Sequence, residues 1–197
     1  MNLFYILFPL IILFIQESKQ ELLPKEYFPL AVGNQWYYIG DNEKVQKRNT
    51  YYRQMYDYSE SRQVVSEVDI RGEKFFLIVY KRLDPFDGKI FKIDSAYFAY
   101  RGTKIIKIPA SKMLDSSAVI TYMDFSIELN KPIRFSRNDI IYEQVLRTEG
   151  DSIITSYSSL RGGLDSGAQF SLKKGIGLFS HSTFIGGTYQ LIRFVLK

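Results

Sequence analysis

The chain has no cysteine and only one histidine among its 197 residues. Without cysteine there can be no disulfide bond, no thiolate catalysis, no cysteine-ligated zinc and no lipid attached through an N-terminal cysteine. The one remaining type of metal site is a calcium site built from carboxylates, and the sequence has no D-x-D-x-D-G loop that would form one. We therefore expect neither a bound metal nor a cofactor.

Residues for nucleophilic catalysis are equally scarce. His181, in LFSHSTF, is the only imidazole that could act as a base, and no G-x-S-x-G elbow presents a serine. A lone histidine is more often a surface or structural residue, so we expect no catalytic residue. Asp84 and Asp87, in DPFDG, are explained as turn formers. Neither RGGLDSG (161–167) nor GIGLF (175–179) has the residues of a phosphate-binding loop or a dinucleotide site.

Long runs of basic residues are also missing. Lys and Arg number 26 against 21 Asp and Glu, a formal charge of +5, and the densest basic cluster is Lys44, Lys47 and Arg48. A nucleic-acid-binding protein more often has a basic stripe or a recognised motif. We therefore expect a mildly basic solvated surface and no nucleic-acid partner.

No apolar run reaches the roughly 20 residues that a membrane-spanning helix needs. A shorter run extends from Leu3 to Ile15 and is followed at once by the polar residues QESKQE. A run of about 7 to 15 apolar residues is typical of a signal peptide, although no small-x-small cleavage site follows. We expect residues 1–20 to be a signal peptide or an N-terminal anchor. The chain would then be exported, to the periplasm, the envelope or the extracellular space, with membrane contact only through an uncleaved leader.

Aromatic and β-branched residues, in contrast, are plentiful. The chain is 46% hydrophobic and 16% aromatic, with 15 Tyr and 15 Phe. Such a composition can build a sizeable core and favours strands over helices. Residues 21–197 suit a single β-rich domain and leave little room for two.

Strand patterns recur along this region between turn residues. RQVVSEVDI (62–70) alternates, with Val64, Val68 and Ile70 on one side, whereas KFFLIVYKRL (74–83) is apolar on both faces, as a central or covered strand would be. Residues 110–123 could hold a helical turn or short helix before returning to strand near Tyr122. The other predicted strands are 89–100, 103–108, 131–136, 139–149, 152–160, 168–174, 176–182 and 188–197.

This spacing, without helical patterns between the strands, predicts an all-β fold. We expect about ten to twelve strands in one mainly antiparallel, strongly curved sheet that closes to a barrel or half-barrel. A two-sheet β-sandwich is the alternative. Gly33-Asn34 predicts a tight turn before a first strand on which Trp36 and Tyr38 share a face, and we expect Trp36 to be mostly buried.

The tyrosines of TYYRQMYDYSE (50–60) form the most suggestive surface pattern. Tyr52, Tyr56 and Tyr58 share one strand face, with Tyr51 on the other. Aromatic surfaces can stack on sugars or line an apolar cavity, but tyrosine is also a common strand residue whose ring packs inward. The pattern assigns no ligand-binding residue.

Two motifs are distinctive and a third is weaker: FPLAVGNQWYY (28–38), KKGIGLFSHSTFIGGTYQLIRF (173–194) and YMDFSIEL (122–129). They resemble the F-P-L-x-x-G-N-x-W-x-Y opening, the K-G-I-G-L closing turn and a Tyr-x-Asp-Phe-Ser landmark of small exported β-rich domains found in many bacteria. Many of those domains are lipoproteins, and this chain lacks the cysteine that carries their lipid. The resemblance implies an exported β-rich domain. Because the family has no established activity, it implies no catalytic residues.

The expected function is therefore non-enzymatic. The chain would be an exported envelope or extracellular protein that binds an unidentified ligand or envelope component through its sheet, or a structural module. The alternative is a carbohydrate-active hydrolase that uses paired carboxylates, whose positions the fold sets rather than the sequence spacing. An open interior lined by aromatic residues would favour small-molecule binding, facing carboxylates would favour hydrolysis, and a packed interior would favour a structural role.

Overall fold

The structure is a computed structural model. It describes residues 22–41, 59–84, 87–137, 140–150, 153–160, 167–183 and 187–197. The strands are β1 (Gln35–Asp41), β2 (Glu60–Ile70), β3 (Glu73–Leu83), β4 (Ile90–Arg101), β5 (Lys104–Pro109), β6 (Ile120–Asp124), β7 (Ile133–Arg137), β8 (Ile140–Glu149), β9 (Ile153–Leu160), β10 (Gly167–Lys173), β11 (Gly177–Thr183) and β12 (Gly187–Val195). The helical segments are α1 (Pro24–Tyr27) and the 3₁₀ turns η1 (Ala110–Lys112) and η2 (Ser116–Ala118). Within these ranges no helix is long and apolar enough to span a membrane.

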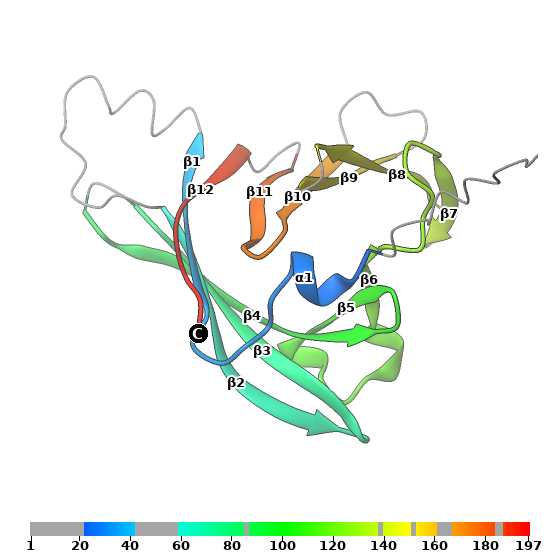
Figure 1. Ribbon diagram of the computed structural model, residues 1–197. Coiled ribbons are helices and arrows are strands. Elements are labelled where there is room, and N and C mark those ends of the chain that lie inside the picture. The colour runs from blue at the N-terminus through cyan, green and yellow to red at the C-terminus, as the bar shows by residue number, and fades with distance from the viewer. Residues whose placement is uncertain are drawn as a thin grey trace, which may run out of the picture.

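All twelve strands belong to one antiparallel sheet in the order β6-β5-β4-β3-β2-β1-β12-β11-β10-β9-β8-β7. The first and last strands pair at its centre, and β6 and β7, consecutive along the chain, are its two edges. The sheet is strongly bent but not closed (Figure 1). The predicted all-β, curved antiparallel fold is confirmed in its half-barrel form, with one sheet in place of the two in the sandwich alternative.

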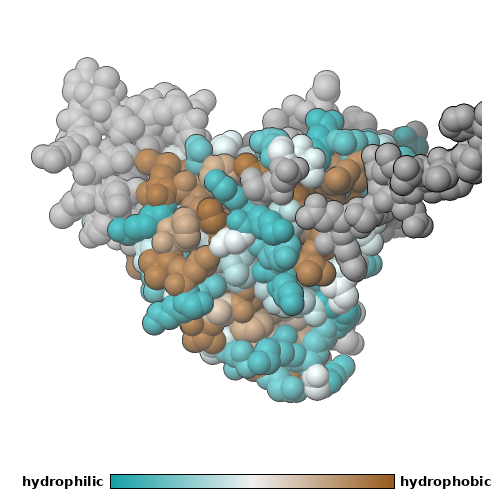
Figure 2. Space-filling model, viewed as in Figure 1, coloured by the Kyte–Doolittle hydropathy of each residue, from teal (hydrophilic) through white to brown (hydrophobic). Residues whose placement is uncertain are grey.

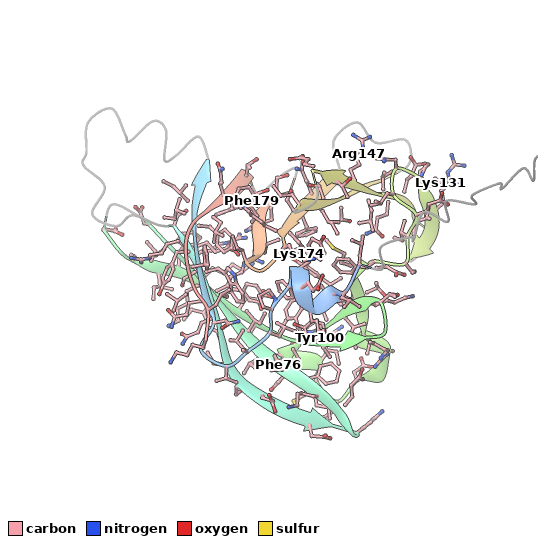
Figure 3. The ribbon with its side chains drawn as sticks, viewed as in Figure 1. Phe76, Tyr100, Lys131, Arg147, Lys174 and Phe179 are labelled. Carbon is pink, nitrogen blue, oxygen red and sulfur yellow. The ribbon has the colours of Figure 1, made fainter. Side chains whose placement is uncertain are left out.

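The concave face of the bent sheet holds the hydrophobic core. In Figure 1, α1 lies between the wall formed by β2–β4 and the strands β8–β11. Side chains such as Phe76 and Tyr100 point into this space in Figure 3. One buried cluster joins residues from both halves of the sheet, among them Trp36, Phe98, Met123, Leu146, Ile154 and Leu178. The interior is therefore largely packed, and any ligand site must fit into what the core leaves open.

A smaller cluster lies on the convex face. It contains Phe75, Ala99, Ile106 and Ile108, and Ala118 and Val119 of the segment after β5 pack against it. This cover explains why the sequence of β3 is apolar on both faces. The helical turn predicted near residue 110 is present as η1.

The alternation predicted for β2 is interrupted by a bulge between Val64 and Ser66. Val64 pairs with Ile78 and lies in the main core, whereas Val68 pairs with Phe75, which belongs to the convex cluster. Assigning Val64 and Val68 to one face was therefore wrong, because an extra residue in a bulge moves every later side chain to the opposite face.

The opening and closing motifs of the sequence meet in the structure. Trp36 is 1% exposed, which confirms the prediction that it is buried. Its indole Nε1 donates a hydrogen bond of 2.6 Å to the carbonyl oxygen of Ile176, and Phe28 stacks on its ring with centroids 6.1 Å apart. The two segments lie 140 positions apart in sequence, so this contact joins the two ends of the domain.

Asn34 and the α1 segment strengthen the same junction. The amide of Asn34 donates to the carbonyl of Pro29, and its side-chain oxygen accepts from the backbone N–H of Lys197. Lys174, which lies next to α1 in Figure 3, pairs with Glu26 of that helix at 3.0 Å. These contacts hold the N-terminal segment across the concave face.

The surface mixes residue types. Figure 2 shows hydrophobic residues scattered among hydrophilic ones on the face in view. Phe91 and Ile93 of β4 are 66% and 64% exposed, so the face that they share with Tyr97 is the convex one. The described residues on this face therefore form no single continuous patch that would by itself identify a partner.

Candidate functional site

A buried charged cluster interrupts the hydrophobic core where β2, β3 and β11 contribute polar side chains to the concave face. We call the residues Glu60, Arg62, Arg82 and His181 the Glu60 cluster. Glu60, at the start of β2, is 1% exposed. Its two carboxylate oxygens each accept a bond of 2.8 Å from a guanidinium Nε, Oε1 from Arg62 and Oε2 from Arg82. A buried carboxylate needs such partners, because an unpaired buried charge is strongly unfavourable.

The local sequence places these groups on one face. Glu60 and Arg62 are two residues apart on β2, so both side chains point to the same side of the strand. Arg82 is the residue paired with Glu60 on β3. The antiparallel register therefore sets the carboxylate directly between two guanidinium groups.

The cluster is permanently charged. Burial alone would raise the pKa of Glu60, but the guanidinium of Arg62, together with the bond from Arg82, holds the pKa of this carboxyl well below its usual range. Burial would likewise lower the pKa of Arg62, and the Glu60 carboxylate raises it instead. Glu60 is thus an anion throughout the physiological pH range and cannot donate a proton as a general acid.

His181 is the neutral member. It is 4% exposed, and its Nε2 lies 2.7 Å from Nη2 of Arg62 and 3.1 Å from Oε1 of Glu60. Since a guanidinium can only donate, Nε2 of the neutral ring accepts from Arg62, and the proton sits on Nδ1. Burial lowers the pKa of His181, and the Arg62 charge adds to this effect, although Glu60 opposes it. His181 is therefore a buried residue of the cluster and does not lie on the surface.

Tyrosine rings surround the charged groups. The guanidinium of Arg62 lies 5.2 Å from the ring centroid of Tyr38 and 5.0 Å from that of Tyr80. The guanidinium of Arg82 lies 5.0 Å from the Tyr189 ring, which stacks on His181 at 4.8 Å. Cation–π contacts of this kind stabilise an arginine while keeping water away from it. The rings therefore fix the directions of both guanidinium groups.

A cavity of about 160 Å³ opens beside the Glu60 cluster. Its lining residues come from β2, β3, β4, β5, β6 and β10: Glu60, Arg62, Tyr80, Arg82, Lys92, Asp94, Lys107, Tyr122 and Phe170. Across it, the rings of Tyr122 and Phe170 lie 5.1 Å apart and join the two halves of the sheet. Lys92 and Asp94 are exposed, so they form the solvent side of the cavity. The lining has four basic and two acidic side chains, an excess of two positive charges when all are ionised.

Two donors in this lining are unused. Lys107 makes no ion pair with a described residue, and its ammonium lies 5.6 Å from the Tyr80 ring centroid and 5.8 Å from that of Phe98. Burial lowers the pKa of Lys107 and repulsion from Arg62 lowers it further, although the Asp94 carboxylate opposes both effects. The hydroxyl of Tyr122 is buried, and the nearby guanidinium of Arg62 can only donate, so the phenol O–H has no acceptor among the described residues. Buried polar groups are normally bonded, so both point to a missing acceptor.

A second hollow, of about 470 Å³, lies on the convex face under the segment after β5. Its apolar lining includes Phe75, Ile108 and Met113. Three of its four charged residues have partners, since Arg101 pairs with Glu73 at 2.6 Å and Asp69 accepts the Gly72 N–H, and the fourth is Arg71. Nothing in this hollow calls for a polar ligand, and the concave cavity is the stronger candidate.

The other residues considered from the sequence do not form a site. The tyrosines at 51, 52, 56 and 58 lie outside the described residues. Asp87 accepts the backbone N–H of Lys89, which fits its predicted turn role. No group of three or more His, Asp or Glu residues that could hold a metal occurs within the described ranges. Two carboxylates, Glu60 and Asp94, do line the cavity, but Glu60 is already bonded to two arginines.

Sequence reasoning missed Glu60, Arg62, Arg82 and Lys107. Their alternation with apolar residues looked like ordinary solvent-facing strand positions. The one available signal was that Arg82 and Lys107 follow the same period as core residues of their strands, Ile78 and Ile105. That signal shows which face a residue occupies but cannot tell which strands lie side by side.

Comparison with known proteins finds similar solved structures. No known family model and no curated protein matches the chain. A crystal structure from Bacteroides fragilis NCTC 9343, described provisionally as an exported protein with a YmcC-like fold, is 11% identical with a TM-score of 0.49, covering 86% of this chain and 99% of that one. A second, from Parabacteroides distasonis ATCC 8503 and described provisionally as a lipoprotein, is 11% identical with a TM-score of 0.43, covering 86% and 98%. Both descriptions name the class of protein that the sequence motifs resemble, but likeness at this level establishes neither a shared family nor a shared function.

Proposed function

We propose that this protein is an exported, non-enzymatic binding protein whose small ligand enters the concave cavity beside the Glu60 cluster. The observation that carries the proposal is the pair of unused donors, Lys107 and the Tyr122 hydroxyl, in an otherwise packed interior. A core that served only to hold the fold together could use apolar residues here, often with no loss of stability.

The alternative, a hydrolase with paired carboxylates, is less well supported. A glycosidase needs one carboxylic acid with a raised pKa to protonate the leaving group. The pKa of Glu60 is lowered instead, and both its oxygens are bonded to guanidinium groups. We therefore favour binding over hydrolysis.

A purely structural role is the remaining alternative. The packed concave face agrees with it, but Lys107 does not, since its ammonium lies partly out of water over two aromatic rings with no described carboxylate bonded to it. A bound anion would balance that charge.

The proposal of export rests on the apolar run from Leu3 to Ile15 and the polar stretch after it. The protein would then act in the periplasm, the envelope or the extracellular space. Mass measurement of its N-terminus, after fractionation of the cells that make it, tests this. A protein found with Met1 in the cytosolic fraction would contradict export, and an intact Met1 in the membrane fraction would indicate an anchor.

Binding is tested by a ligand-observed NMR screen of ring-sized fragments of all charge types. Phe170→Trp adds bulk to the cavity wall and is expected to abolish the hits. Phe179→Trp, a half-buried phenylalanine on β11 outside the cavity, is the matched control and should leave them unchanged. If no fragment distinguishes Phe170→Trp from the wild type, the cavity is not a ligand site.

A further inference from the structure

The cavity beside the Glu60 cluster has more positive than negative charge and more donors than acceptors. We infer that its ligand presents a compact oxyanion, a carboxylate or a group of the phosphate or sulfate type, to Lys107, Tyr122 and the two arginines. This inference rests on the proposed function and deepens it by naming the chemical class that the site recognises.

Lys107 is the first argument. Its side chain points from β5 to the concave face, as does that of Ile105, whereas Ile106 and Ile108 belong to the convex cluster. The ammonium is therefore held inside the bend of the sheet, over aromatic rings and without a described carboxylate bonded to it. An anion would stabilise this ammonium more strongly than a neutral ligand would, because opposite charges attract more strongly in a partly desolvated site.

Tyr122 supplies a second donor from the neighbouring strand. β6 pairs with β5, and the hydroxyl of Tyr122 is buried in the cavity lining with no described acceptor. A phenol can donate one hydrogen bond and accept others. The Tyr122 hydroxyl needs an acceptor, and the basic side chains beside it need a negative charge. An anionic oxygen would meet both needs.

The two arginines give the third argument, because Glu60 fixes the orientation of their guanidinium groups. Glu60 occupies Nε of both guanidinium groups, and His181 occupies one terminal nitrogen of Arg62. Among the described residues no acceptor bonds the terminal nitrogens of Arg82. Guanidinium terminal nitrogens bind carboxylate and phosphate oxygens in a fork geometry. A carboxylate that fixes the Nε side leaves the other side ready for an external anion.

The size of the cavity limits the ligand. A cavity of about 150 Å³ accepts a molecule the size of benzene, and this cavity is about 160 Å³. The rings of Tyr80 and Phe170 form part of its wall. A ring-sized group that carries one oxyanion therefore fits the space, the walls and the charge together.

Calorimetric titration with four probes of one shape tests the inference: benzoate, phenyl phosphate, benzyl alcohol and benzylamine. We expect at least one of the two anions to bind about tenfold more tightly than the alcohol, and the amine to bind worst. A preference between benzoate and phenyl phosphate distinguishes a carboxylate from a phosphate-type ligand. Equal or tighter binding of the alcohol or the amine would overturn the inference.

Two variants locate the anion. Lys107→Met keeps the aliphatic stem and removes the charge, and Tyr122→Phe removes the hydroxyl without changing the ring. Each should weaken anion binding, the first by about tenfold, and leave the affinity for benzyl alcohol unchanged. Lys104→Met, on the same strand but without contact with the cavity, is the control and should change neither.

The results separate the two proposals. If benzyl alcohol or benzylamine binds and Phe170→Trp abolishes that binding, the cavity is a ligand site but its ligand is not an anion. If anions bind equally well to Lys107→Met, Tyr122→Phe and the wild type, the anion inference is wrong. If no probe binds in a manner that depends on Phe170, both proposals are contradicted.

Discussion

The Glu60 carboxylate is buried together with the groups that keep it ionised. Its oxygens face Arg62 and Arg82, and His181 completes the contact without adding a charge. Continued ionisation of Glu60 therefore depends on its partners, and the orientation of both arginines depends on Glu60. Single substitutions at this position should act on several groups at once.

Glu60→Gln keeps the shape of the side chain and removes its charge. Two guanidinium groups would then lie close together without an anion between them, so we expect the free energy of unfolding to fall by about 3 to 5 kcal/mol. Urea denaturation measures this. The control is Glu67→Gln on the same strand, where the carboxylate is 41% exposed and its pair with Lys74 should contribute less than about 1 kcal/mol. Equal losses for the two variants would contradict the electrostatic role of Glu60.

His181 is the only histidine, so its ring signals in a proton NMR spectrum can be assigned without ambiguity. We predict that they titrate with a pKa below the ordinary value of 6.5, because burial and Arg62 disfavour the charged ring. A midpoint at or above 6.5 would contradict the neutral, Arg62-accepting state.

The same group makes stability depend on pH. Because the pKa of His181 is lowered by folding, the unfolded chain binds more protons than the native one as the pH falls below about 6.5. The stability that neutral His181 contributes is fully present above about pH 6.5. It is lost as the pH falls through the pKa of His181 in the folded protein. The lowered pKa of Glu60 adds a second loss that starts below about 4.5. Between pH 7 and pH 5 the urea midpoint of the wild type should therefore fall further than that of His181→Phe, which has no group to titrate at this position.

At the scale of elements, the junction of β1 with the turn before β11 holds the domain together. Gly177 has a φ of 105°, and a Cβ added there would lie 3.0 Å from Nε1 of Trp36. The backbone at the start of β11 therefore needs glycine both for its positive φ and for its close contact with the indole.

Gly177→Ala should lower the free energy of unfolding by more than the roughly 1 kcal/mol of an ordinary positive-φ glycine. Gly72→Ala is the matched control, since Gly72 has a φ of 80° and nothing within 4 Å of the added methyl group. Thermal unfolding followed by Trp36 fluorescence measures both. If the two variants lose the same stability, the Trp36 contact contributes nothing to the junction.

The strands and turns could be predicted because their signals are local. Apolar alternation, Gly-containing turns and the tight turn at Gly33 each act within a few residues, and twelve strands were found where about ten to twelve were expected. The bulge at Val64 could not be predicted, because the alternating pattern on each side of it reads the same with or without an extra residue.

The candidate site could not be predicted for a different reason. Glu60, Arg82 and Lys107 come from three strands, and only the pairing of β2 with β3, and the bending of the whole sheet, brings them to one cavity. In the sequence each was one polar residue among many on a strand. The tyrosine pattern that stood out instead lies outside the described residues.

At the scale of the whole molecule, the packing of the concave face determines where a ligand can bind. The sheet does not close, because its edge strands β6 and β7 do not pair with each other. The core fills most of the space inside the bend, and the polar cavity lies where Tyr122 of one half meets Phe170 of the other. A ligand bound there would contact both halves of the sheet. Binding should therefore stabilise the bent form of the sheet, and the protein should unfold at a higher temperature when the cavity is filled.

Mapping of amide chemical shifts during titration with benzoate tests the central claim most directly, because it shows where a small anion binds. The account predicts that the largest changes occur at Arg62, Tyr80, Lys107, Tyr122 and Phe170, and that they disappear in Phe170→Trp. Changes confined to the convex hollow around Phe75 and Met113, or no saturable change in any amide, would contradict it.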